Sequence, residues 1–155
     1  MSAATTYELD PVTVALQAWL AANVLTGAVG ELPFPIGDSA APLDADDTPV
    51  PPPYGVIYQG TAIRASVRPY AGNVEVTARW IVTAVGSTPS QTRHYADRVR
   101  KAFAGEDADG AQTAMDLTAA GVRVLARRSQ EDGALDLVGR IWQWTETFEA
   151  DLAPA

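Results

Sequence analysis

Few residues in this chain are of types that could perform chemistry. The one histidine, His94, follows Arg93 on what the pattern predicts to be a charged helix face, where a solvated imidazole is far more common than a catalytic one. Asp44, Asp46 and Asp47 could bind a hard cation, but their spacing lacks the glycine and the distal glutamate of an EF-hand loop. A solvated acidic loop is the commoner meaning of such a run. Neither set predicts a catalytic or metal site.

The tryptophans offer another chemical option, an aromatic platform for sugars or bases. Trp80, Trp142 and Trp144 lie in segments that alternate like strands. Large aromatic residues dominate both protein cores and interfaces, so core packing is the favoured interpretation. An intermediate interpretation is that some of them anchor a subunit interface.

The chain contains no motif for a metal, a nucleotide or a cysteine nucleophile. It has no cysteine, which excludes disulfides, thiolate zinc sites and cysteine catalysis. The patterns HxxxH, HExxH, GxGxxG and GxxxxGK[ST] are all absent. The sequence therefore predicts no cofactor, and metal and nucleotide hypotheses have no motif to rest on.

The elements that would position these residues are organised around the segment 73–105. Apolar and polar residues alternate over 74–85, which is the period of a half-buried antiparallel strand. Ile81 and Val85 interrupt the polar face of this strand. We expect a neighbouring element or another subunit to cover part of that face.

The helix predicted after this strand has strong end signals. Thr88 supplies an N-cap hydroxyl, Pro89 fits the first helical position, and Gln91 is placed to close a capping box. Gly105 fits a left-handed C-cap. The apolar stripe recurs at three- and four-residue spacing: Tyr95, Ala96, Val99, Ala102 and Phe103. One face of this helix should pack on a sheet, and the other is charged.

A further amphipathic helix is predicted near the N-terminus. Asp10 and Pro11 open it as a cap and a first helical proline, and Thr26 and Gly27 end it, which gives about four turns. Its polar face has no lysine or arginine, so core packing is predicted in preference to binding at a membrane surface.

The remaining pattern predicts an α+β fold. Strands are expected over 54–59, 61–67 and 121–128, and a longer last strand over 139–148. The segment 30–53 is rich in proline and aspartate and shows neither period, which predicts a surface loop or partial disorder. The segment 149–155 predicts a flexible tail. We expect one domain over 1–155, with an antiparallel sheet of about four strands and two main helices packed on one face.

Length and charge limit the class of protein. A chain of 155 residues with 47% hydrophobic content is long enough for one domain with a core. The net charge of −8 argues against specific nucleic-acid binding through phosphate neutralisation. No basic signal-peptide region and no continuous apolar span are present, so folding in the cytosol is expected and membrane insertion is not.

The order of these segments resembles the tail terminator proteins of long, non-contractile-tailed bacteriophages, the lambda-type minor tail protein U group. The shared features are the N-terminal amphipathic helix, the proline-rich loop before PPPYGVIYQG, the strand VEVTARWIVTAVGST, the helix QTRHYADRVRKAF and the closing strand GRIWQWTETFEADL. The resemblance covers about 10–148, and its most telling parts are 80–91 and 96–100.

The resemblance implies a virion assembly protein and not an enzyme. Such a protein forms a ring, a homohexamer, on the head-proximal end of the tail, stops polymerisation of the tail tube and presents the surface for head-tail joining. Its implied partners are its own copies, the major tail tube protein and the head-tail connector or neck proteins. No membrane takes part, and DNA passes through the ring without specific binding. The implied location is the virion tail, with assembly in the host cytoplasm.

Ring closure requires two different surfaces on each subunit. The candidate interface residues are charged residues of the central strand and its helix, together with two tryptophans of the last strand: Arg79, Arg93, Asp97, Arg98, Arg100, Lys101, Trp142 and Trp144. A solvated helix face would explain the charged residues equally well.

Two other functions fit the same sequence. One is a different head-tail joining protein, such as a head-closure or connector component, which binding to purified tail tubes would distinguish. The other is a small ligand-binding α+β domain with Trp142 and Trp144 lining a pocket.

Overall fold

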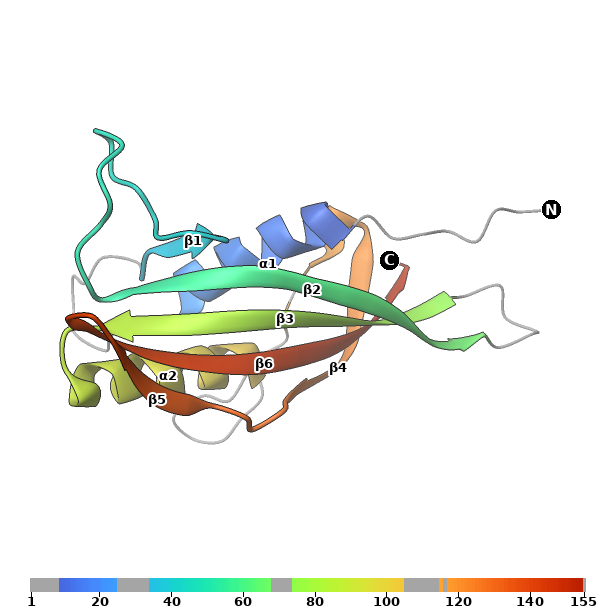
Figure 1. Cartoon of the computed structure of the whole chain (residues 1–155). Helices are drawn as coiled ribbons and strands as arrows, with labels where there is room; N and C mark the ends of the chain where they lie inside the picture. Colours follow the sequence, from blue (N-terminus) through green and yellow to red (C-terminus); the bar gives the residue numbers. More distant parts are fainter. Residues whose placement is uncertain (1–8, 25–33, 68–73, 105–114, 116, 155) are drawn as a thin grey trace.

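The computed structural model describes residues 9–24, 34–67, 74–104, 115 and 117–154 (Figure 1). In chain order its elements are α1 (Leu9–Asn23), β1 (Ile36–Asp38), β2 (Tyr54–Val67), β3 (Val74–Gly86), α2 (Pro89–Ala104), the 3-10 helix η1 (Thr118–Ala120), β4 (Val122–Ser129), β5 (Ala134–Val138) and β6 (Ile141–Pro154). None of the helices among these residues is long and apolar enough to cross a membrane.

The strands form one mixed sheet of six, with the order β1-β2-β3-β6-β4 and with β5 also paired to β6. All pairings are antiparallel except that of β1 with β2. Strand β3 pairs with one edge of β6, so β4 and β5 must share the other edge, one after the other along its length. The predicted α+β class is confirmed, and the sheet has two strands more than the four expected.

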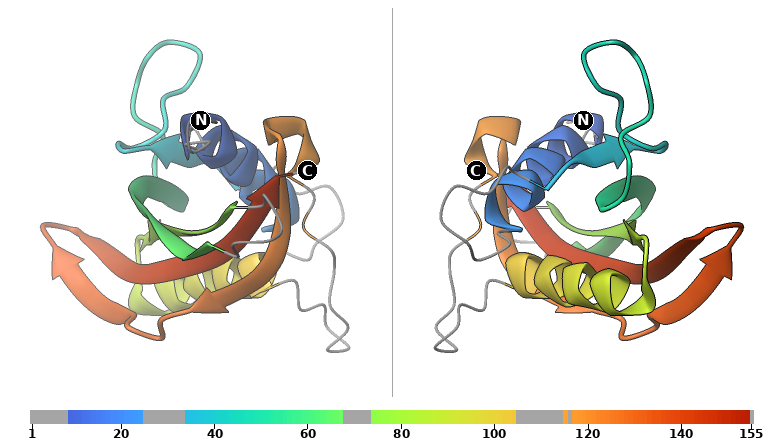
Figure 2. Two further views of the ribbon diagram at one scale, coloured as in Figure 1. Left: turned by 90° about the vertical axis from the view of Figure 1, so that its right-hand side faces the viewer. Right: turned by 90° about the vertical axis from the view of Figure 1, so that its left-hand side faces the viewer.

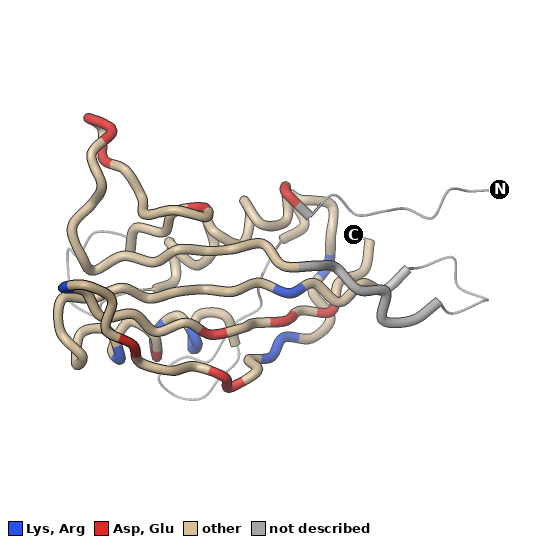
Figure 3. The backbone as a smooth tube through the Cα atoms, viewed as in Figure 1, with Lys and Arg blue, Asp and Glu red and all other residues tan. Residues whose placement is uncertain are grey.

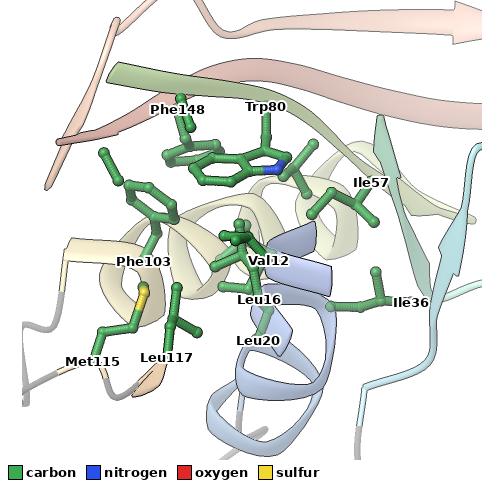
Figure 4. Packing of buried hydrophobic residues seen from close by; sticks show 14 of the residues in the cluster. Val12, Leu16, Leu20, Ile36, Ile57, Trp80, Phe103, Met115, Leu117 and Phe148 are labelled. Carbon is green, nitrogen blue, oxygen red and sulfur yellow. The ribbon is translucent and has the colours of Figure 1, made fainter. Parts of the chain in front are cut away.

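Both helices pack on one face of this sheet, where the core lies (Figure 4). Trp80 and Phe148 project from β3 and β6, and both are fully buried. The Phe103 ring from α2 meets them at centroid distances of 6.5 Å and 4.8 Å. Leu16 and Leu20 of α1 complete the contact from the other side. The predicted core role of Trp80 is therefore confirmed.

The start of α2 follows the predicted cap closely. The backbone N–H of Gln91 donates to Oγ1 of Thr88 at 3.1 Å, as an N-cap requires. The Gln91 side chain accepts a hydrogen bond from the N–H of Ser87 at 2.8 Å, one residue before the group that a capping box normally uses. The predicted C-cap at Gly105 lies outside the described residues.

The loop predicted over 30–53 contains a short strand that the pattern did not reveal. Strand β1 pairs in parallel with β2 at one edge of the sheet. The predicted strands 54–59 and 61–67 are one continuous strand, β2, with a register shift after Gln59. Gly60 lies at this shift. A Cβ at position 60 would lie 2.5 Å from the carbonyl oxygen of Arg79 in β3, so a larger residue would not fit without a movement of the backbone. The glycine accommodates a close backbone approach instead of ending the strand.

The prediction of a flexible tail over 149–155 is wrong. Strand β6 continues to Pro154 and stays paired with β3 and β4. Leu152 is fully buried and Ala153 is 4% exposed. Small residues and a proline gave this segment the composition of a tail, but its alternation of Phe148, Ala150 and Leu152 continues the core face of the strand.

Candidate functional site

Four of the eight predicted interface residues take part in ion pairs within the chain. Arg79 and Arg100 each form an ion pair with a glutamate of β6. Lys101 pairs with Asp97 along α2 at 3.0 Å. The other four are exposed or half-buried: Arg93, Arg98, Trp142 and Trp144. Contact of these residues with another subunit stays a prediction.

Arg100 holds a carboxylate that is almost fully buried. Glu146 is 2% exposed. Arg100 donates from Nε to Oε2 at 3.0 Å and from Nη2 to Oε1 at 2.7 Å, which is the strong bidentate arrangement. The hydrogen bond to Glu146 raises the pKa of Arg100. A carboxylate buried to this degree requires such a partner, so Arg100 has an internal structural role.

A second group of charges, here called the carboxylate ladder, consists of Arg79, Arg128, Glu149 and Asp151. Arg79 and Glu149 alternate with the buried Trp80 and Phe148, so they point to the sheet face away from the helices. Figure 3 shows basic positions of β3 and β4 on either side of acidic positions of β6. Glu149 of β6 is 6% exposed. It accepts hydrogen bonds from Arg79 of β3 at 2.9 Å and 2.6 Å, and from Arg128 of β4 at 2.9 Å. Arg128 also donates to Asp151 at 3.0 Å and 3.2 Å. The carboxylate ladder therefore links three neighbouring strands.

Two aspartates of this face have a lowered pKa. Asp132 accepts hydrogen bonds from the backbone N–H and the hydroxyl of Thr147, at 2.8 Å and 2.7 Å, and these lower its pKa. The hydrogen bond from Arg128 lowers the pKa of Asp151, with a further contribution from the hydroxyl of Thr77. Both carboxylates are therefore held ionised by groups of neighbouring strands.

These shifts predict that the protein loses stability in acid. A carboxylate whose pKa is lower in the folded state stabilises that state fully above the unfolded pKa of about 3.9, and the contribution disappears as pH falls through the folded value. We expect the urea midpoint to fall between about pH 5 and pH 2. The variants Asp132→Asn and Asp151→Asn should each show a shallower fall, with about 1 kcal/mol less stability at pH 7 because both sites are largely solvated. Acid profiles identical to that of the unmodified protein would contradict this assignment.

The turn between β1 and β2, residues 39–50 and here called the acidic loop, is held by its own hydrogen bonds. The backbone N–H of Asp44 donates to the carbonyl of Thr48, and that of Val50 donates to the carbonyl of Pro42, both at 2.9 Å. The Asp44 carboxylate accepts from the N–H groups of Asp46 and Thr48. Asp44 thus closes the turn. Within the described ranges no group of three or more metal-ligating side chains is placed to hold an ion.

The two tryptophans of β6 lie beside the β5–β6 hairpin. Trp142 and Trp144 pair with Leu137 and Leu135 of β5. The Trp144 ring nitrogen lies 3.5 Å from Oε1 of Glu146. A Cβ on Gly133 would lie 2.1 Å from that same nitrogen, which shows how closely the loop before β5 packs on the indole. These contacts support a packing role for Trp144.

His94 has the solvated position that its sequence context predicted. The side chain is exposed on α2, and its ring meets that of Tyr95 edge-on at a centroid distance of 5.2 Å. Tyr95 in turn stacks on Phe34, which precedes β1. Neither contact supplies a nucleophile or a base for catalysis.

Sequence reasoning missed the carboxylates that organise these clusters. The sequence pattern does not indicate Glu146, Glu149 or Asp151 as site residues, and it assigns the last two to the predicted tail over 149–155. A signal was present, since acidic residues recur along the last strand while Arg127 and Arg128 are adjacent in another strand. Cross-strand pairing depends on register, and register was the missing information.

Comparison with known proteins finds matches among solved structures. No protein-family model matches the chain, and no curated protein matches it. A solved structure, described as the virion of native gene transfer agent (GTA) particle, contains a chain with the same arrangement. The TM-score is 0.57 at 14% sequence identity, and the alignment covers 96% of this chain and 99% of that chain. The two chains share a fold.

Proposed function

We propose that this protein is a structural component of a phage-like virion and does not catalyse a reaction. The observation that carries the proposal is the whole-length fold match to a chain of a gene transfer agent virion. The side chains described above support it, because buried carboxylates of β6 are used in pairs that hold elements of the fold together. Arg100 joins α2 to Glu146 of β6, and Arg79 joins β3 to Glu149 of β6.

Within that class we propose the role of tail terminator. The protein forms a closed ring, a hexamer, at the head-proximal end of the tail, ends growth of the tail tube and presents the surface to which the head joins. Two observations support this role: the sequence resemblance to tail terminators, and the presence in the structure of the helix, strand, helix and closing strand that carry this resemblance. The partners are further copies, the tube protein and the neck proteins, and no cofactor is needed.

The proposal is tested by measuring assembly on purified tail tubes. Light scattering across a concentration series gives the mass of the protein alone, and a parallel sample contains tubes of the matching tail protein. We expect a hexameric mass, alone or on the tubes, and tubes that no longer elongate when the protein is present. Reversing the charge of Arg100 would be a poor probe, because it breaks the internal pair with Glu146.

The same experiment separates the neighbouring functions. Binding to the head connector without binding to tail tubes would replace the terminator role with that of a head-closure protein. A monomer that binds neither the tube nor the connector would contradict a virion role altogether.

A further inference from the structure

Two surfaces of opposite charge lie on opposite sides of the molecule. The acidic loop contains Asp44, Asp46 and Asp47, and no lysine or arginine occurs between positions 34 and 60. On the other side, the outward face of α2 bears the exposed cations Arg93 and Lys101 and one exposed carboxylate, Asp97, which pairs with Lys101. In Figures 1 and 2 the loop extends upward beyond the β1–β2 edge of the sheet, and α2 lies at the bottom of the molecule.

Exposed apolar side chains accompany each charged surface. Leu43, directly before the turn at 44–48, is 57% exposed. Strand β5 contacts α2, and its far end projects beyond the helix in the hairpin with β6 (Figure 2). Leu137 and Val138 at that end are 51% and 47% exposed. Apolar groups next to complementary charges are the composition expected of a protein interface.

The acidic loop is already shaped for binding. Its backbone hydrogen bonds and the capping carboxylate of Asp44 hold the turn without help from a partner. A segment that is ordered before it binds loses less conformational entropy on binding, so more of the contact energy appears as affinity. Asp46 and Asp47 stand exposed at the end of this turn.

We propose that the acidic loop of one copy binds the outward face of α2 and the β5 end of the next copy. Asp46 and Asp47 then face Arg93 and Lys101, while Leu43 approaches Leu137 and Val138: a contact of unlike surfaces. Repeated by rotation, a contact of that kind closes a ring. This inference rests on the ring proposed above and names the surfaces that build it.

Charge reversal tests the electrostatic part of the contact. The variants Asp46→Lys and Arg93→Glu should each weaken association of the copies by at least about tenfold, because like charges then face one another. The double variant, with both changes in one chain, should recover most of the association, since each contact again pairs opposite charges. Arg123→Glu is the matched control, because it makes the same charge change on exposed β4, away from both surfaces.

Cysteine crosslinking tests the geometry independently of ring closure. The chain has no cysteine, so each introduced thiol is unique. Protein carrying Asp46→Cys is mixed with protein carrying Arg93→Cys under mild oxidation. A covalent dimer of the two is expected, and little should form when Arg123→Cys replaces Arg93→Cys. Circular dichroism of each variant confirms that it folds.

The possible results separate this contact from the proposed function. Closed assemblies that form without crosslinking and without sensitivity to either charge reversal would overturn the contact and leave the ring intact. Specific crosslinking in a protein that never closes into a ring would support the contact and count against the terminator role. Absence of any association, alone or on tail tubes, would overturn both.

Discussion

Replacing Arg100 with methionine is expected to lower the free energy of unfolding by about 3 kcal/mol. The substitution keeps most of the apolar side chain and removes both donors to Glu146. That carboxylate is 2% exposed and would be left buried without its charge partner. We expect the low end of the usual 3–5 kcal/mol range, since about 39% of the Arg100 side chain is already in contact with water. Urea denaturation followed by circular dichroism at pH 7 measures the change.

Arg100 and Glu146 should differ in the stability that is lost when each is replaced alone. Glu146→Leu leaves Arg100 unpaired, but its guanidinium can turn to solvent, so this loss should be smaller than that of Arg100→Met. The double variant should recover most of the stability, because a buried ion pair can often be replaced by apolar groups at little cost. A double variant whose loss equals the sum of the two single losses would show that no coupling exists between these side chains.

The order and type of the main elements were predictable because each has a local signal. The end of β3 and the start of α2 are an example, since Thr88, Pro89 and Gln91 determine a helix start from their own chemistry. Strand β6 was harder. Its last residues have the composition of a tail, and only their pairing with β3 and β4 makes them a strand. That pairing is a tertiary effect which a window of sequence does not contain.

The charged clusters were less predictable for the same reason. The sequence predicts Arg79 and Arg100 as interface residues because they lie on charged faces of a strand and a helix. Their partners, Glu149 and Glu146, lie 70 and 46 residues away along the chain. An ion pair over such a separation depends on strand register and helix packing. The sequence pattern therefore indicated the two arginines as charged surface groups, but it did not indicate the carboxylates to which they bind.

The internal pairing also indicates which charges are available for assembly. The guanidinium groups of Arg79 and Arg128 are bound to Glu149 and Asp151, where they hold β3 and β4 to β6. Arg93 is exposed on α2, and Lys101 of the same helix pairs with the likewise exposed Asp97. The contact that we propose between copies would use such exposed charges, in a protein whose net charge is −8.

The largest single loss is expected for Trp80→Ala, about 4 kcal/mol. Trp80 is fully buried at the centre of the core, so its removal leaves a large cavity between the sheet and both helices (Figure 4). The ring also has a polar role. Its Nε1 donates to Oγ1 of Thr13 at 3.0 Å, and that hydroxyl donates to Oε1 of Gln59 at 2.8 Å, which ties α1 to β3 and β2. Urea denaturation measures the loss. Val14→Ala is the control, because Val14 lies on α1, the helix that Trp80 contacts, and is 62% exposed.

Smaller substitutions separate the cavity from the hydrogen bond. Trp80→Phe should cost less than Trp80→Ala because much of the ring remains, and Thr13→Val should cost about 1–3 kcal/mol because it leaves the indole N–H buried without this acceptor. A loss below about 1 kcal/mol for Trp80→Ala would mean that the helices close over the vacated space. Assembly gives a further distinction: Trp80→Ala should weaken it only to the extent that the chain unfolds, whereas Asp46→Lys should weaken it in a chain that stays folded.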